Sequence, residues 1–152
     1  MSNTSRPAYF VKQSVNRQFH RFILIDTDSV ALARAESIIR RKKSRHSEIM
    51  LFSTAKEAIE YMVTEDFTRE DADTVVLADL HMPDIDGLDL LDRMGNTFEA
   101  MKDRLYIFFF SDSARPDEVK SVLSHIYVIW LFRKPISSEN IGKIIDCFQY
   151  PL

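Results

Sequence analysis

The sequence is poor in cysteine and glycine, and each shortage disfavours a class of protein. Cys147 is the single cysteine among 152 residues, which excludes an internal disulfide framework and is typical of a reducing cytosol. The three glycines form no loop that could cradle phosphates at a helix N-terminus, so a flavin or nucleotide binder is disfavoured. We therefore expect a cytoplasmic protein stabilised by a packed core, and a hydrophobic content of 45% is sufficient for one.

Long apolar runs and a strong charge imbalance are also missing. No segment approaches the roughly 20 apolar residues of a membrane-spanning helix, and residues 1–20 lack the apolar centre of a signal peptide. The net charge of −3 gives no general basic field for nucleic acid. The basic run 40–46 has no interleaved aromatic residues, and we interpret it as cations at the negative end of a helix dipole. The sequence thus predicts a protein that binds neither membranes nor nucleic acid.

Short apolar segments alternate with amphipathic ones along the chain. Five segments have the continuous apolar character of buried strands: 21–26, 48–53, 75–79, 105–110 and 127–132. Helical spacing of apolar residues follows each of them, with predicted helices at 29–43, 54–63, 88–94, 116–126 and 141–148. We expect the acidic segment 65–73 to be a surface connection, and the helix before Gly95 to fray there.

This alternation predicts an α/β fold with a parallel sheet covered by helices on both faces. Right-handed crossovers then give a flavodoxin-like, doubly wound, five-stranded sheet in the order 2-1-3-4-5. The predicted domain covers residues 21–150. Residues 1–20 form an N-terminal extension with a polar composition and four apolar residues of note, Tyr9, Phe10, Val11 and Phe19.

The segment from Thr74 to Leu91 carries the most specific motif. Asp79 ends a buried strand, Met82-Pro83 stops it, and Asp86-Gly87 turns the chain into the next helix. Ligands of open α/β sheets bind beyond the carboxyl ends of strands, so Asp79 is a candidate nucleophile or metal ligand. This segment resembles the D-x-x-M-P-x-x-D-G phosphoacceptor segment of bacterial two-component response regulator receiver domains, and the resemblance extends from Arg21 to about Gln149.

The resemblance implies a role for each polar strand end. Asp79 would be the phosphoacceptor, and Ser111 and Lys134 would bind phosphoryl oxygens. Asp26, Asp79 and the backbone carbonyl of His81 would hold Mg²⁺, a hard cation that prefers oxygen ligands. Lys134-Pro135 resembles the Lys-Pro junction of the family, which is often cis.

Three positions depart from the family pattern. Thr27 stands where the family usually has a second acid, so Thr27 or Asp28 is the remaining candidate ligand near Asp26, and we expect weak Mg²⁺ binding. Asp112 follows Ser111 where a small residue is usual. Leu131 stands at the place of the aromatic residue that often switches conformation. From these three departures we expect either slower phosphorylation chemistry or a different coupling of phosphorylation to output.

We therefore expect a single-domain response regulator that accepts phosphate from a histidine kinase or phosphotransfer protein and signals to an unknown downstream protein, with a homodimer as a possible form. Such a domain is not an enzyme beyond its own phosphotransfer and dephosphorylation. Two alternatives remain. Thr27 favours a receiver-like binding module that works without phosphorylation, whereas Asp79, Ser111 and Lys134 disfavour it.

The second alternative is a haloacid-dehalogenase-like phosphohydrolase. Its strand-D-x-D motif is similar to Asp26-Thr27-Asp28, with Asp26 as the nucleophile. After Lys134 only Glu139 and Asp146 remain as acids, inside a predicted helix, so the acidic metal-binding pair of that family is missing. This alternative also leaves the Met82-Pro83 and Asp86-Gly87 pattern unexplained.

Overall fold

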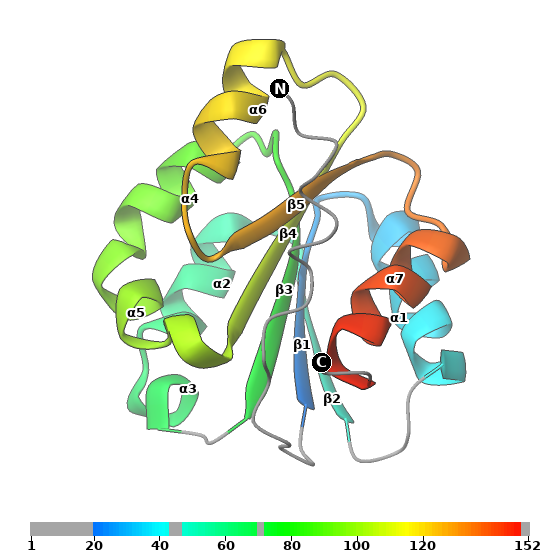
Figure 1. The fold of residues 1–152 in the computed structure, drawn as a ribbon, viewed down its shortest axis with the longest axis horizontal. Coiled ribbons are helices and arrows are strands. Elements are labelled where there is room, and N and C mark those ends of the chain that lie inside the picture. Colours follow the sequence, from blue (N-terminus) through cyan, green and yellow to red (C-terminus); the bar gives the residue numbers. More distant parts are fainter. Residues whose placement is uncertain (1–19, 43–46, 70–71, 150–152) are drawn as a thin grey trace.

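The computed structural model describes residues 20–42, 47–69 and 72–149 (Figure 1). Almost all of the predicted N-terminal extension, residues 1–19, lies outside this part of the chain. Among the described residues, five strands form one parallel sheet in the order β2-β1-β3-β4-β5, which confirms the predicted topology. The strands are β1 (His20–Ile25), β2 (Ser47–Phe52), β3 (Asp73–Asp79), β4 (Leu105–Ser111) and β5 (Val128–Arg133).

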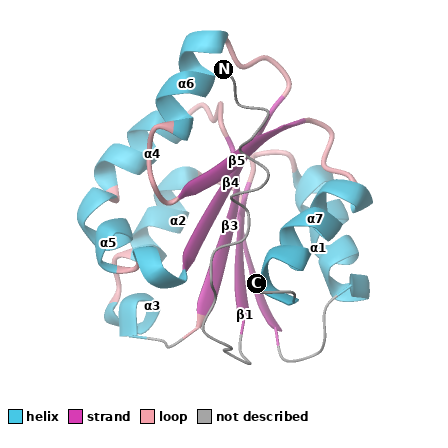
Figure 2. Cartoon of the chain, viewed as in Figure 1, coloured by secondary structure: helices cyan, strands magenta, loops and turns pink. Residues whose placement is uncertain are grey.

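Helices cover both faces of the sheet, as Figure 2 shows. On one face lie α1 (Ser29–Lys42) and α7 (Ser138–Gln149). On the other lie α2 (Ala55–Met62), α3 (Glu65–Arg69), α4 (Gly87–Arg93), α5 (Gly95–Ala100) and α6 (Pro116–Leu123). A short 3-10 turn, Lys102–Arg104, precedes β4. Among the described residues, no helix is long and apolar enough to cross a bilayer.

Each buried strand divides its side chains between two apolar cores. In β1, Phe22 and Leu24 pack with α1 and α7, whereas Ile23 and Ile25 pack with the helices of the other face. This alternation is the two-residue period of a strand, and both faces are apolar because both are covered. The edge strand β2 is the exception, since Glu48 and Leu51 are exposed.

Local signals start the helices where the sequence predicted them. The hydroxyl of Thr54 accepts a hydrogen bond from the backbone N–H of Glu57 at 3.1 Å and itself donates to the Glu57 carboxylate at 3.0 Å, so it caps α2. Asp86 caps α4 by accepting from the N–H of Asp89 at 3.0 Å. Capping at Asp86 sets the direction of the chain just after the candidate phosphoacceptor.

The structure differs from the sequence predictions at three places. The segment 65–73 is not a simple surface connection, because it contains α3, whose Phe67 is fully buried, and it ends in the first residue of β3. The helix after Asp86 ends near Gly95 as expected, since α4 stops at Arg93, but a short helix that was not predicted, α5, begins at Gly95 and buries Phe98. Ile126, predicted on the apolar face of α6, lies beyond the end of that helix and is 65% exposed.

The sheet also holds a buried cation at the end remote from Asp79. Arg21 is 2% exposed, and its guanidinium donates to the Thr74 hydroxyl at 3.0 and 3.1 Å and to the carbonyl of Phe67 at 2.8 Å. The guanidinium carbon lies 4.4 Å from the centre of the Phe67 ring. These contacts offset the cost of burying the charge and attach α3 to the start of β1 and β3.

Candidate functional site

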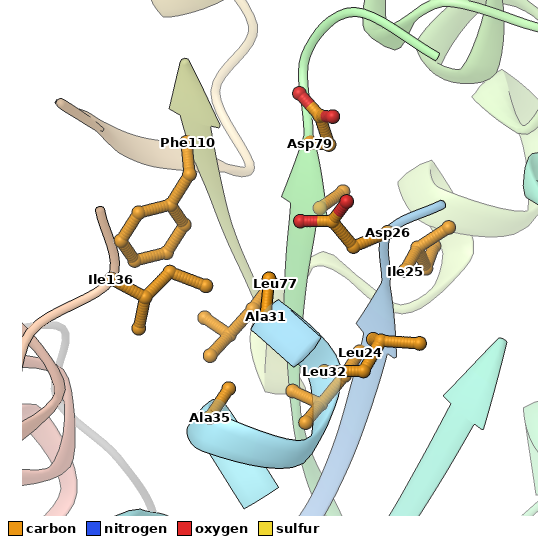
Figure 3. A pocket seen from close by; sticks show the side chains of 11 residues that line it. Leu24, Ile25, Asp26, Ala31, Leu32, Ala35, Leu77, Asp79, Phe110 and Ile136 are labelled. Atoms are coloured by element: carbon orange, nitrogen blue, oxygen red, sulfur yellow. The ribbon is translucent and has the colours of Figure 1, made fainter. Parts of the chain in front are cut away.

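Two carboxylates meet at the carboxyl edge of the sheet. Asp26 follows β1 directly and Asp79 ends β3. The strands are parallel neighbours with Ile25 opposite Ala78, so the next residues of both chains lie side by side. Figure 3 shows both carboxylates above an apolar floor that includes Leu24, Leu77 and Ala31. These residues line a cavity of about 10 Å³. The predicted convergence of the two strand ends is therefore present.

Lys134 completes this cluster from the end of β5. Its Nζ atom lies 3.1 Å from Oδ2 of Asp26 and 3.2 Å from Oδ2 of Asp79. Its backbone N–H donates to the carbonyl of Ser111 at 2.9 Å, which anchors the residue against the end of β4. The Lys134–Pro135 peptide bond is cis. One ammonium thus faces two carboxylates.

The electrostatics of the cluster favour an added cation. Burial raises the pKa of Asp79 above its usual range, although the N–H of His81 and the charge of Lys134 oppose this shift. Burial alone would lower the pKa of Lys134, but the carboxylates of Asp26 and Asp79 outweigh it, and the net shift is upward. Lys134 therefore remains an ammonium. With both carboxylates ionised the cluster carries one uncompensated negative charge.

Thr27 and Asp28 do not point into the cluster as a second acid would. Thr27 is exposed. The carboxylate of Asp28 accepts from the N–H groups of Val30 at 2.9 Å and Ala31 at 3.3 Å, so it caps α1. The backbone N–H of Asp28 donates to Oδ1 of Asp26 at 2.9 Å, which orients that carboxylate.

Ser111 and His81 form a network that the sequence did not indicate. The buried Ser111 hydroxyl accepts from the N–H of Ser113 at 3.1 Å and lies 3.3 Å from Nδ1 of His81. The other ring nitrogen of His81, Nε2, lies 2.9 Å from a carboxylate oxygen of Glu118 in α6. Only the carbonyl of His81 was predicted to matter. A histidine two residues after Asp79 was the available signal for its side chain.

The loop between β3 and α4 is held at both ends. The N–H of Gly87 donates to the carbonyl of Leu80 at 2.7 Å, which closes the loop on itself. The carboxylate of Asp84 accepts from the N–H of Lys56 at 2.9 Å in the first turn of α2. The backbone around His81 is therefore positioned by contacts to a neighbouring helix.

The other two departures from the expected pattern lie beside the cluster. Leu131 is partly buried and packs against the core on the α2–α6 face. Asp112 is exposed and lines a pocket of about 370 Å³ next to Lys134. The remaining lining residues are Asp28, Val30, Ala31, Arg34, Pro135 and Ile136. This pocket therefore borders the cluster on the side of Lys134.

Comparison with known families identifies the chain. Residues 22–146 match the model of the response regulator receiver domain. The chain belongs to the response regulator receiver family. This assignment removes the support for the phosphohydrolase alternative, because a single receiver match includes Asp26 and the rest of the site.

Solved receiver structures share the fold. A two-component response regulator from Cytophaga hutchinsonii has 21% identity and a TM-score of 0.73 over 88% of this chain and 98% of its own. A response regulator receiver protein from Dyadobacter fermentans has 22% identity and a TM-score of 0.69 over 86% and 98%. A CheY-like receiver protein from Methanospirillum hungatei has 18% identity and a TM-score of 0.63 over 87% and 98%. A search of curated proteins found no match.

Receiver domains generally bind Mg²⁺ at their acidic pocket, and the oxygen atoms here fit that ion. Mg²⁺ is commonly held by one or two carboxylates with several waters, and Asp26 and Asp79 supply two. The uncompensated negative charge of the cluster favours a cation. Within the described ranges, no group of three or more histidine, cysteine or acidic side chains is arranged to hold a metal.

Proposed function

We propose that this receiver domain accepts a phosphoryl group on Asp79 from a histidine kinase or phosphotransfer protein. The main support is the convergence of Asp26, Asp79 and Lys134, with the Ser111 hydroxyl nearby on β4. A carboxylate oxygen of Asp79 attacks phosphorus while the bond from phosphorus to the donor imidazole nitrogen breaks. The product is an acyl phosphate on Asp79 and a free donor histidine.

The surrounding residues assist this transfer by binding charge. Lys134 is already 3.2 Å from Asp79 and moves its ammonium contact to a phosphoryl oxygen. Ser111 donates its hydroxyl hydrogen to another. Asp26, Asp79 and the carbonyl of His81 would hold Mg²⁺, which offsets the charge of the incoming phosphoryl group when bound. Thr27 and the helix-capping Asp28 add no charged ligand, so the ion is held weakly.

The donor protein approaches over α1. Val30 is 74% exposed, and it lines the pocket that also reaches Lys134. An exposed apolar side chain beside a charged cluster is a suitable contact for a helical partner. We infer that the histidine enters through this pocket, and that the downstream protein or a second copy uses the surface around α6 and β5, where Leu131 is partly buried.

Labelling with acetyl phosphate tests the phosphoacceptor. The wild-type protein should incorporate one acid-labile and hydroxylamine-labile phosphoryl group per chain with Mg²⁺ present, measured by intact mass at neutral pH. Asp79→Asn should incorporate none. The control is Asp89→Asn, an exposed acid in α4, which should be labelled like the wild type. Full labelling of Asp79→Asn would contradict the proposal.

A second candidate function is a binding module that signals without phosphorylation. The exposed Thr27 and the commitment of Asp28 to α1 favour it, because both weaken the metal site. A wild-type protein that takes up no label from acetyl phosphate or from any phosphohistidine donor, while it still binds its partner, would support this function instead.

A further inference from the structure

The His81 side chain connects the candidate site to a helix on the protein surface. Its Nδ1 lies 3.3 Å from the Ser111 hydroxyl oxygen, and its Nε2 lies 2.9 Å from Oε2 of Glu118. Glu118 stands in the first turn of α6, where its other oxygen accepts from the N–H of Arg115 at 2.9 Å. A continuous chain of hydrogen bonds therefore extends from Ser111 to the start of α6.

The direction of these hydrogen bonds follows from the donors and acceptors. The N–H of Arg115 and the ring of His81 hold the pKa of Glu118 below its usual range, so Glu118 is an anion that only accepts. Nε2 of His81 must then carry the ring hydrogen. In a neutral imidazole the other nitrogen is an acceptor, so the Ser111 hydroxyl donates to Nδ1 of His81.

This arrangement occupies the single hydrogen of Ser111. The hydroxyl oxygen already accepts from the N–H of Ser113 at 3.1 Å, and its one O–H group is directed to His81. A phosphoryl group on Asp79 needs the same hydrogen. Because a charged phosphoryl oxygen is a stronger acceptor than a neutral ring nitrogen, phosphorylation draws the hydroxyl away from His81.

We propose that His81 is a positioning residue. It holds the Ser111 hydroxyl before phosphorylation and transmits the release of that hydroxyl through Glu118 to α6. This inference rests on the proposed phosphoryl transfer to Asp79. The loss of one contact loosens the imidazole, and Glu118 then loses a fixed partner in the first helical turn. Leu131 lacks the ring of the usual aromatic switch, and this route does not require one.

The experiment uses the full chain with Mg²⁺ and beryllofluoride as the phosphoryl analogue. Calorimetry measures binding, and hydrogen exchange measures the response of the peptide that covers α6. Five proteins are compared: the wild type, His81→Ala, Glu118→Ala, the double variant with both of these changes, and the control Asp117→Ala. Alanine at position 81 keeps the backbone carbonyl. Asp117 is an exposed acid of the same turn that contacts Arg115 but not His81.

In the wild type and in Asp117→Ala, beryllofluoride should change exchange across α6. His81→Ala and Glu118→Ala should lose most of that change although they bind the analogue. His81→Ala should bind it about threefold to tenfold more tightly, because the hydrogen bond that it removes is worth that range of affinity. The double variant should show the same α6 response as either single variant, since both break one route.

Results that would overturn the role of His81 differ from the result that would refute the proposed function. An unchanged α6 response in saturated Glu118→Ala or His81→Ala would overturn the inference, as would a wild type that binds the analogue without a response in α6. If His81→Ala fails to fold, Glu118→Ala decides, because it leaves the loop after Asp79 intact. A wild type that does not bind Mg²⁺ and beryllofluoride would refute the proposed function, and the inference would fall with it.

Discussion

The Nζ atom of Lys134 lies 3.1 Å from a carboxylate oxygen of Asp26, a residue 108 positions earlier in the chain. The same atom lies 3.2 Å from Asp79. Two carboxylates on neighbouring strands repel each other, and Lys134 is the cation between them. Because the two carboxylates are largely buried, water screens their repulsion only in part, and the positive charge of Lys134 is needed to offset it.

Lys134→Met should destabilise the protein at neutral pH. The substitution keeps much of the side-chain volume but leaves Asp26 and Asp79 without their cation. We expect a loss of about 1–2 kcal/mol in the free energy of unfolding, less than for a fully buried pair because a fifth of the Lys134 side chain is exposed. Urea unfolding at pH 7 measures it. The control Lys120→Met, on an exposed position of α6, should change little, and equal losses for both would contradict the assigned role of Lys134.

Asp79→Asn should stabilise the protein at pH 7. Since burial raises the pKa of Asp79 above 3.8, the folded state holds its proton more tightly than the unfolded state. The protein therefore loses stability as the pH rises from the pKa of Asp79 in the unfolded state to its higher pKa in the folded state. Asparagine has no such ionisation and avoids that loss. The melting temperature should be higher by a few degrees at pH 7, at about 2–4 °C per kcal/mol.

Below the unfolded pKa of Asp79 the advantage of asparagine should vanish, because both side chains are then neutral. Thermal melts of both proteins at several pH values between 3.5 and 7 follow this convergence. Asp103→Asn, at an exposed position, should show no comparable pH dependence. A constant difference between Asp79→Asn and wild type at every pH would point to packing instead of ionisation.

Thr27→Asp should strengthen Mg²⁺ binding. A second carboxylate next to Asp26 adds charge and an oxygen ligand, and we expect about tenfold tighter binding or more, a change comparable to other alterations around metal sites. Calorimetric titration with Mg²⁺ measures the difference. Asp28→Ala is the control: it should cost about 1 kcal/mol of stability through loss of the α1 cap, while Mg²⁺ affinity stays near that of wild type. Loss of Mg²⁺ binding in Asp28→Ala would show that Asp28 is itself a ligand.

Gly87→Ala should be destabilising for steric reasons. A Cβ atom at this position would lie 2.6 Å from Cδ1 of Leu80 and 2.9 Å from Cε1 of Phe109, both in the core. Overpacking of this kind costs about 1–3 kcal/mol. Gly95→Ala is the matched control, because no atom lies within 4 Å of its Cβ position, and it should be neutral or slightly stabilising. Chemical unfolding of the two variants compares them, and similar stabilities would contradict the close approach at Gly87.

The sequence predicted the sheet well because its strands have a simple signature. Continuous apolar runs that end in a polar residue defined each strand to within about two residues, as with Asp79 at the end of β3. Polar strand ends of a parallel sheet must meet at one edge, so Asp26, Asp79 and Lys134 could be brought together without coordinates. The residues of the site itself were therefore accessible to sequence analysis.

The contacts between loops and helices were not accessible in the same way. No spacing rule indicates that His81 faces Glu118, 37 positions later. The acidic composition of 65–73 concealed Phe67, which is buried in the core and whose ring contacts the guanidinium group of Arg21. Arg21 was expected to open a strand, and only its tertiary partners explain why a charged side chain is fully enclosed.

The hydrogen bond between Asp84 and the N–H of Lys56 has a consequence for how such a site can diverge. A helix that supplies no ligand determines where the loop carrying His81 lies. Substitutions in the first turn of α2 can therefore shift the loop that carries Asp84 and His81 while Asp26, Asp79 and Lys134 stay the same. Two receivers with identical site residues need not have identical kinetics, since the variation that separates them can lie in a helix that never touches the phosphoryl group.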